Sequence, residues 1–186
     1  MNNKEKFIEY EKLLKEWSTR TNLVAPSTLS NIQKRHIADS AQLADFIPKD
    51  VNIIDLGSGA GFPGVVMAIL GWNVTCIESI KKKTDFLNTL KQELNLPNLT
   101  IINDRIENFL SKTPVKSGNF IFTARAFAPL IKIMDYTAKT KCRLFLLKGR
   151  EIETEINIAK KKYKFDYSLY PSKTGDGYIT YIKPMK

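Results

Sequence analysis

The sequence predicts an α/β fold: a doubly wound, mostly parallel sheet of seven strands with an antiparallel last strand, preceded by a helical N-terminal extension. Short apolar strands alternate with helical patterns from residue 51 onward, which is typical of successive βα units. Two alternating strands joined by a Pro- and Gly-rich turn then end the chain as a β-hairpin. The 186 residues fit a single domain, with residues 1–50 as the extension and residues 51–186 as a Rossmann-like core.

The N-terminal extension contains two helical patterns. Residues 4–17 place apolar side chains on one face, which predicts an amphipathic helix packed on the core. After a polar break containing Pro26, residues 28–46 resume a helical pattern. Within it the motif RHIADS sets Arg35 and Asp39, and likewise His36 and Ser40, one turn apart. This spacing alone favours an ion pair beside a hydrogen-bonded histidine over a ligand site.

A glycine-rich turn follows the first predicted strand, residues 52–56. The stretch at 59–64 is a literal G-x-G-x-x-G, and Glu78 lies where a dinucleotide site has its ribose-binding acid. Asp55, however, would repel a pyrophosphate and favour a cation, and Pro63 removes an N–H that an anion would use. S-adenosylmethionine has an ammonium and a sulfonium but no phosphate. The turn, including Gly57 and Gly59, therefore favours this cofactor, with NAD as the alternative.

Three later strands deliver polar side chains to the same edge of the sheet. Glu78 closes the strand at 72–78, Arg125 follows 119–124 and Lys148 follows 143–147. The carboxyl ends of parallel strands line the ligand crevice in such folds, so we expect these side chains near a ligand. A carboxylate at Glu78 can accept both hydroxyls of a ribose. The remaining predicted elements are helices at 81–94, 129–139 and 150–162, a strand at 99–103, and hairpin strands at 163–170 and 178–183.

Composition restricts the class of protein. The net charge of +10 favours a polyanionic partner, and residues 131–186 hold 13 Lys and Arg against 6 Asp and Glu. The triple lysine at 160–162 is one candidate RNA contact in that basic third. Two cysteines, Cys76 and Cys142, and a single histidine make a metal site improbable. With no apolar run of membrane-spanning length and no signal peptide, we expect a cytoplasmic protein.

Several motifs together resemble the glucose-inhibited division protein B family, bacterial methyltransferases that modify N7 of one guanine in 16S ribosomal RNA. The similarity runs almost end to end, and RHIADS, the GFPG ending and TARAF are more specific than the glycine turn alone. The motifs are TNLV at 21–24, RHIADS at 35–40, DLGSGAGFPG at 55–64, Glu78 with the lysines after it, RIE at 105–107, TARAFAPL at 123–130 and LLKG at 146–149.

The resemblance implies S-adenosyl-L-methionine as cofactor, 16S ribosomal RNA or the small ribosomal subunit as partner, and no general base. The family usually has Gly-Arg-Ala-Glu after its third strand, where this chain has Asp104-Arg105-Ile106-Glu107. By position, the cofactor contacts implied by the family and the turn fall on Asp55, Gly57, Gly59, Phe62, Glu78, Ile106, Glu107 and Arg125. The residues expected to orient RNA are Arg35, His36, Arg125 and Lys148. We expect a monomer; a non-catalytic RNA-binding module and an NAD-dependent oxidoreductase are the alternatives.

Overall fold

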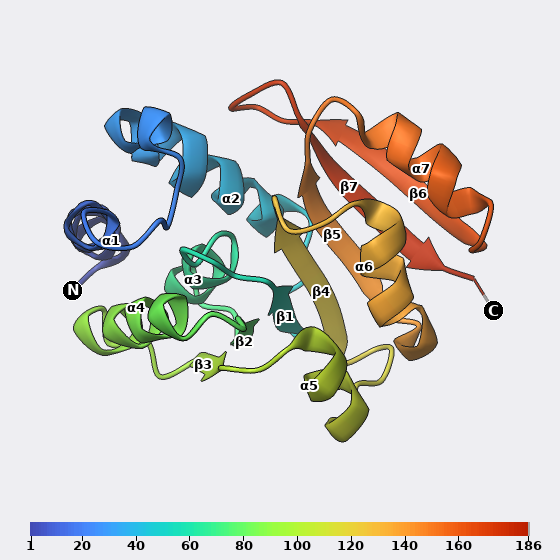
Figure 1. The fold of residues 1–186 in the computed structure, drawn as a ribbon, viewed down its shortest axis with the longest axis horizontal. Coiled ribbons are helices and arrows are strands. Elements are labelled where there is room, and N and C mark those ends of the chain that lie inside the picture. The colour runs from blue at the N-terminus through green and yellow to red at the C-terminus, as the bar shows by residue number, and fades with distance from the viewer. Residues whose placement is uncertain (186) are drawn as a thin grey trace.

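The computed structural model describes residues 1–185 and contains one seven-stranded sheet in the order β3-β2-β1-β4-β5-β7-β6 (Figure 1). Strands β1 to β5 are parallel to one another, whereas β7 is antiparallel to both β5 and β6. This confirms the predicted doubly wound sheet and its antiparallel last strand. The strands are β1 (Asn52–Leu56), β2 (Val74–Ile77), β3 (Leu99–Ile102), β4 (Phe120–Arg125), β5 (Arg143–Lys148), β6 (Phe165–Pro171) and β7 (Tyr178–Pro184).

Helices cover both faces of the sheet, so the central strands are buried on two sides. On β1, Ile53 belongs to one apolar cluster and Ile54 to the other, because successive side chains of a strand point to opposite faces. The first cluster contains the buried residues of α1 (Asn3–Ser18), α3 (Gly64–Ile69) and α4 (Lys81–Glu93). The second contains those of α5 (Ile106–Lys112), α6 (Leu130–Thr137) and α7 (Ile152–Lys160). Figure 1 shows the two groups on opposite sides of the sheet.

The second half of the N-terminal extension differs from the single helix expected at residues 28–46. It consists of a 3₁₀ segment η1 (Pro26–Asn31), a π-helical segment η2 (Gln33–Ala38), one turn of α-helix α2 (Asp39–Ala41) and a second 3₁₀ segment η3 (Gln42–Asp45). The apolar pattern could not show this, since the three helix types differ mainly in hydrogen-bond spacing. A π-helical turn inside a helix is frequent at functional sites, and this one contains His36.

Most other elements match their predicted ranges to within a few residues, the usual uncertainty of helix and strand ends. Pro63 is the N-cap residue of α3. Between residues 1 and 185 no helix is long and apolar enough to cross a membrane.

Candidate active site

The glycine turn between β1 and α3 is held from beneath by Asp55. Its carboxylate is fully buried and accepts hydrogen bonds from the Gly64 amide (3.2 Å) and from the Thr123 hydroxyl (2.8 Å). Burial raises the pKa of Asp55 to about 6. Because Asp55 does not line the cavity above the turn, the expectation of a direct ligand contact needs correction: its side chain orders the turn and β4 instead.

Two glycines show why the turn excludes larger residues. Gly57 has a φ of +64°, and a Cβ there would lie 2.2 Å from the ring of Phe127. Gly59 has a φ of +55°, and apart from its two chain neighbours the only atom of the described residues within 4 Å of an added Cβ would be the Gly57 carbonyl oxygen at 3.9 Å. Both glycines line the same cavity, so the backbone at Gly59 offers an open surface to a ligand.

Glu78 lies immediately after β2 and faces this cavity. The residue is 6% exposed, and its two carboxylate oxygens accept hydrogen bonds from the amides of Gly59 and Ile80, each at 2.9 Å. A carboxylate has about four acceptor positions, so two remain for a ligand. Glu78 therefore both fixes the glycine turn and presents an acceptor to whatever binds there.

We call the space above the turn the glycine-turn cavity; it has a volume of about 610 Å³. It lies at the carboxyl ends of β1, β2 and β4, as expected for a doubly wound sheet. The structure brings together here most of the residues that the sequence singled out for cofactor binding. Its lining includes Gly57, Gly59, Phe62, Glu78, Ile106, Glu107 and Arg125, together with His36 and part of the segment 23–28.

The N-terminal extension builds one wall of this cavity through stacked rings. The Phe62 ring stacks on Tyr10 (centroids 5.2 Å apart) and on His36 (5.0 Å), and the Arg125 guanidinium lies 5.4 Å from its centroid. The Tyr10 hydroxyl donates to the Ala60 carbonyl at 2.6 Å. As predicted, the apolar face of α1 packs on the core, and it also supports the glycine turn.

His36 connects Arg125 to the segment that lines the cavity. The Arg125 guanidinium donates to Nδ1 of His36, so Nδ1 is the acceptor and the ring proton is on Nε2. Nε2 then donates to the Thr28 hydroxyl (2.8 Å), which donates to the Ala25 carbonyl (2.7 Å). Burial and the nearby Arg125 lower the pKa of His36 to about 4. The structure therefore makes His36 a neutral, buried connector, 5% exposed, rather than an open contact for RNA.

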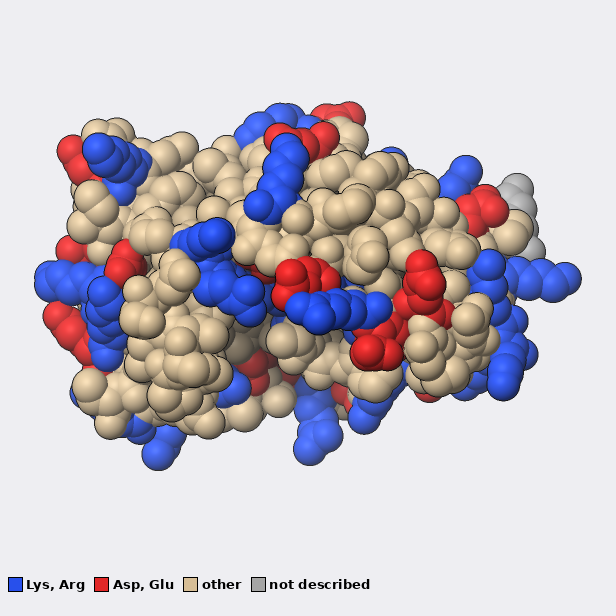
Figure 2. Space-filling model, turned by 90° about the horizontal axis from the view of Figure 1, so that it is seen from above, with Lys and Arg blue, Asp and Glu red and all other residues tan. Residues whose placement is uncertain are grey.

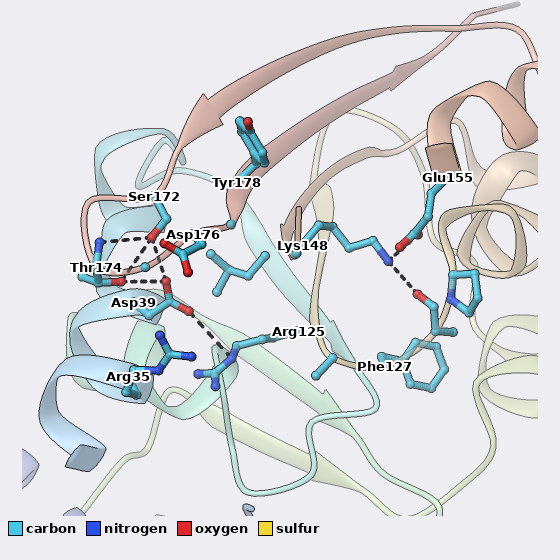
Figure 3. Close-up of a pocket in the computed structure, with 17 residues that line it drawn as sticks. Arg35, Asp39, Arg125, Phe127, Lys148, Glu155, Ser172, Thr174, Asp176 and Tyr178 are labelled. Atoms are coloured by element: carbon cyan, nitrogen blue, oxygen red, sulfur yellow. Dashed lines mark hydrogen bonds and ion pairs between the residues drawn. The ribbon is translucent and has the colours of Figure 1, made fainter. Parts of the chain in front are cut away.

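A second space, which we call the hairpin cavity, has a volume of about 500 Å³ and adjoins the first. Arg125, Ala126 and Phe127 line both cavities and form their common wall. Ala126 has a φ of +49°, so the chain turns sharply at the end of β4. Figure 3 shows the hairpin cavity between this wall, the segment containing Arg35 and Asp39, and the loop that joins β6 to β7.

Lys148 also lines the hairpin cavity, but its ammonium is already engaged. It donates to the Ala128 carbonyl (2.8 Å) and pairs with the Glu155 carboxylate (2.7 Å), with its side chain only 10% exposed (Figure 3). The same Glu155 oxygen accepts from the Leu130 amide at 2.6 Å. Lys148 thus holds the segment after the common wall. Because its ammonium already has two partners, the structure does not support the expectation that Lys148 orients RNA.

Sequence reasoning missed the loop between β6 and β7, residues 172–177, which we call the hairpin loop. The Asp39 carboxylate accepts from the Ser172 hydroxyl (3.1 Å) and the Thr174 hydroxyl (2.8 Å), and its other oxygen lies 3.8 Å from Nε of Arg125. Gln42 adds a hydrogen bond to the loop at the Lys173 amide (2.6 Å). The turn residues indicated a loop but gave no sign of these partners, which are some 130 positions away in the sequence.

No group of three or more His, Cys, Asp or Glu residues that could hold a metal ion occurs within residues 1–185. The polar groups of the site instead converge on Arg125. Its guanidinium contacts His36 and Asp39, and its side chain is 18% exposed. Desolvation in this setting lowers the pKa of Arg125 from its ordinary value, although a guanidinium stays charged at neutral pH.

Comparisons with known structures show the fold. The rRNA methylase of Streptococcus thermophilus superposes with a TM-score of 0.57 at 13% identity, covering 79% of this chain and 94% of that one. M. jannaschii TYW2, solved in complex with AdoMet, gives a TM-score of 0.57 at 14% identity, covering 81% and 76%.

Sequence comparisons show the family. The family described as rRNA small subunit methyltransferase G matches residues 3–174. The protein of that name from Orientia tsutsugamushi (strain Ikeda) is 45% identical over 92% of this chain and 85% of its own length. Its counterpart from Rickettsia prowazekii (strain Madrid E) is 39% identical over 96% and 92%. The chain therefore belongs to the rRNA small subunit methyltransferase G family.

Proposed function

We propose that this chain transfers a methyl group from S-adenosylmethionine to N7 of a guanine in 16S ribosomal RNA, with the cofactor in the glycine-turn cavity and the target base in the hairpin cavity. The supporting observation is the common wall of the two cavities. Arg125, Ala126 and Phe127 line both, so ligands in the two spaces would meet at one place. A methyl transfer requires this adjacency, since donor and acceptor atoms must approach to about 3–3.5 Å.

The residues of the glycine-turn cavity fit S-adenosylmethionine. The open backbone at Gly59 allows close approach of a ligand, and Glu78 retains acceptor positions for ribose hydroxyls. Ile106 and Glu107 begin α5 at the far side of the cavity, where an adenine would lie. The larger Ile106, in place of the family's alanine, is 6% exposed and lines the cavity, which still has a volume of about 610 Å³.

For this reaction the protein has to align the methyl donor with the base, and it does not have to transfer a proton. S-adenosylmethionine would supply an electrophilic methyl group on a sulfonium. Guanine N7 carries an in-plane lone pair and no proton, so no side chain has to act as a base. His36, the only histidine, has a pKa of about 4 and both ring nitrogens engaged, which agrees with this assignment. The common wall would hold the base in line, with Arg125 fixed by His36 and Asp39.

The RNA would approach the carboxyl ends of the parallel strands, where both cavities lie. Arg35, exposed at the rim of the hairpin cavity, is the proposed contact to the RNA backbone. A looped or single-stranded target suits this site, because N7 in the deep, narrow groove of an A-form helix is hard to reach. Both cavities are built from one chain, so we propose that it acts as a monomer, in the cytoplasm where small subunits are made.

Labelled methyl transfer to small ribosomal subunits from cells that lack the modification tests this function. The digested RNA should contain labelled 7-methylguanosine, identified by mass spectrometry. Calorimetry should show binding of S-adenosylhomocysteine and not of NAD. Label on an exocyclic nitrogen, on ribose or on protein would overturn the assignment to N7.

A further inference from the structure

Three carboxylates line the hairpin cavity: Asp39, Glu155 and Asp176. They differ in how many of their acceptor positions are already occupied by hydrogen bonds and ion pairs. Asp39 accepts hydrogen bonds from two hydroxyls of the hairpin loop and from Gln42, and it lies beside Arg125. Glu155 accepts from Lys148 and from the Leu130 amide. Neither can turn to a ligand without leaving these partly buried donors unsatisfied.

Asp176 is the available carboxylate of the three. Within residues 1–185, its side chain has one ion-pair partner, Arg150, and both side chains are largely exposed, 70% for Asp176 and 72% for Arg150. Such an exposed pair is worth little, so a ligand with suitable donors could replace Arg150 at small cost. The guanidinium of Arg150 lowers the pKa of Asp176, which is therefore an ionised acceptor at neutral pH. In Figure 3 Asp176 lies on the hairpin side of the cavity and Phe127 on the opposite side.

The proposed reaction orients a guanine in this cavity. Its N7 must face the place where the two cavities adjoin, beside Arg125 and Phe127, because the methyl donor would lie in the glycine-turn cavity. O6 is the neighbouring acceptor on the same edge of the base, which suits the Arg125 guanidinium. The N1–H and the N2 amino group then point away from N7, toward the hairpin side. They form a pair of parallel donors, and a carboxylate has two oxygens to accept them.

We propose that Asp176 reads the N1–H and N2 amino group of the target guanine and so selects guanine over adenine. The inference rests on the proposed function. Adenine also has a nucleophilic N7, so a site that only positioned N7 would accept both purines. Adenine presents an acceptor at N1 and no N2 amine, so it would leave the Asp176 carboxylate unpaired and face it with a lone pair. Loss of such a two-bond interaction corresponds to roughly a 10- to 100-fold preference.

The test compares Asp176→Asn with the parent enzyme on two substrates. One is the unmethylated small subunit, and the other is the same subunit with adenine in place of the guanine that the parent methylates. An asparagine amide can donate to adenine N1 but cannot accept both guanine donors. We expect kcat/KM for the guanine substrate to fall about 10- to 100-fold and the guanine-to-adenine ratio to fall with it. The affinity for S-adenosylhomocysteine should stay the same, which shows that the variant is folded.

Arg150→Gln is the matched control, because it breaks the same ion pair and keeps the carboxylate. It should preserve the guanine-to-adenine ratio. An Asp176→Asn enzyme that retains the parent ratio would overturn the inference, since a structural or phosphate-linked role would change both substrates equally. If the parent makes no 7-methylguanosine, the proposed function fails and this inference falls with it. Correct methylation by the parent with an unchanged ratio in the variant rejects the inference alone.

Discussion

At the scale of single residues, the two acids of the glycine turn have different surroundings and so different tasks. Asp55 is fully buried beneath the turn, with donors from Gly64 and Thr123. Glu78 lies above it, with both oxygens bound to backbone amides and its side chain on the cavity. Asp55 therefore determines the shape of the turn, whereas Glu78 is placed to touch the ligand. Both acids lie close to the carboxyl end of a strand, Asp55 within β1 and Glu78 just after β2, and the sequence does not distinguish burial from exposure to a cavity.

Replacing Glu78 with alanine should raise the Kd for S-adenosylhomocysteine about 10- to 100-fold, because hydrogen bonds to a charged group contribute about 1.5–3 kcal/mol. Isothermal titration calorimetry measures this loss. Asp85→Asn is a suitable control, since Asp85 pairs with Lys81 on the exposed surface of α4. Equal affinities in the parent and Glu78→Ala would show that Glu78 only supports the turn.

His36 should make stability fall toward acid pH. Its pKa is about 4 in the folded chain and about 6.5 when unfolded, so the unfolded state binds more protons between these values. The contribution of His36 is present above pH 6.5 and is lost as the pH falls toward 4, up to about 3 kcal/mol. Asp55, with a pKa raised to about 6, acts in the opposite direction, since the folded state takes up its proton first.

The variant His36→Gln separates these two effects. Its free energy of unfolding, measured in urea at pH 7, 5.5 and 4.5, should increase relative to that of the parent as the pH falls. The exposed neighbour Lys34, changed to Gln, is the control and should show a constant difference. A difference that does not vary with pH in His36→Gln would mean that the histidine is already able to ionise in the folded chain.

At the scale of elements, the segment after β4 is held at both ends. Arg125 is fixed by the N-terminal extension through His36 and Asp39, and the following residues are fixed from β5 and α7 through Lys148 and Glu155. The sequence predicted these strand ends and their residues. It could not predict that Lys148 is turned inward to a partner on α7, because side-chain direction at a strand end depends on packing from distant elements. The hairpin loop was overlooked for the same reason.

Lys148 and Glu155 should be strongly coupled. Breaking a buried ion pair by removing one partner costs about 3–5 kcal/mol, and this pair is partly exposed at Glu155, so we expect about 2–3 kcal/mol for Lys148→Met or Glu155→Gln. The double variant should lose less than the sum, with a coupling energy of about 1–2 kcal/mol. Urea unfolding of the four proteins measures it. Additive losses would contradict the view that the pair acts as one clamp on the wall.

At the scale of the whole molecule, the parallel topology places both cavities on one edge of the sheet, and the sequence was sufficient for this. Alternating strands and helices predicted the sheet, and the strand-end residues pointed to the edge at which the two cavities lie. Net charge was less informative about where RNA binds. Figure 2, a view onto the edge with the cavities, shows Lys and Arg interspersed with Asp and Glu rather than a continuous basic surface. Helix α7 begins after β5 and runs back along the sheet, so the lysines at 160–162 lie at the opposite edge.

RNA affinity should fall steeply with salt, and the slope should depend on position rather than on total charge. Changing Lys160, Lys161 and Lys162 together to glutamate should leave the slope of log K against log salt unchanged. Lys160 lies over Tyr167, Lys162 pairs with Asp135, and this helix end is remote from both cavities.

Arg35→Gln with Lys173→Gln removes two exposed charges beside the hairpin cavity and should reduce the slope by about 1.5, because each phosphate that is no longer neutralised keeps its condensed counterion. Filter binding of small-subunit RNA from about 50 to 200 mM salt measures both, with S-adenosylhomocysteine affinity as the check on folding. A slope that flattens in the triple lysine variant and not in the double variant would place the RNA across α7, because only charges that meet phosphates release counterions.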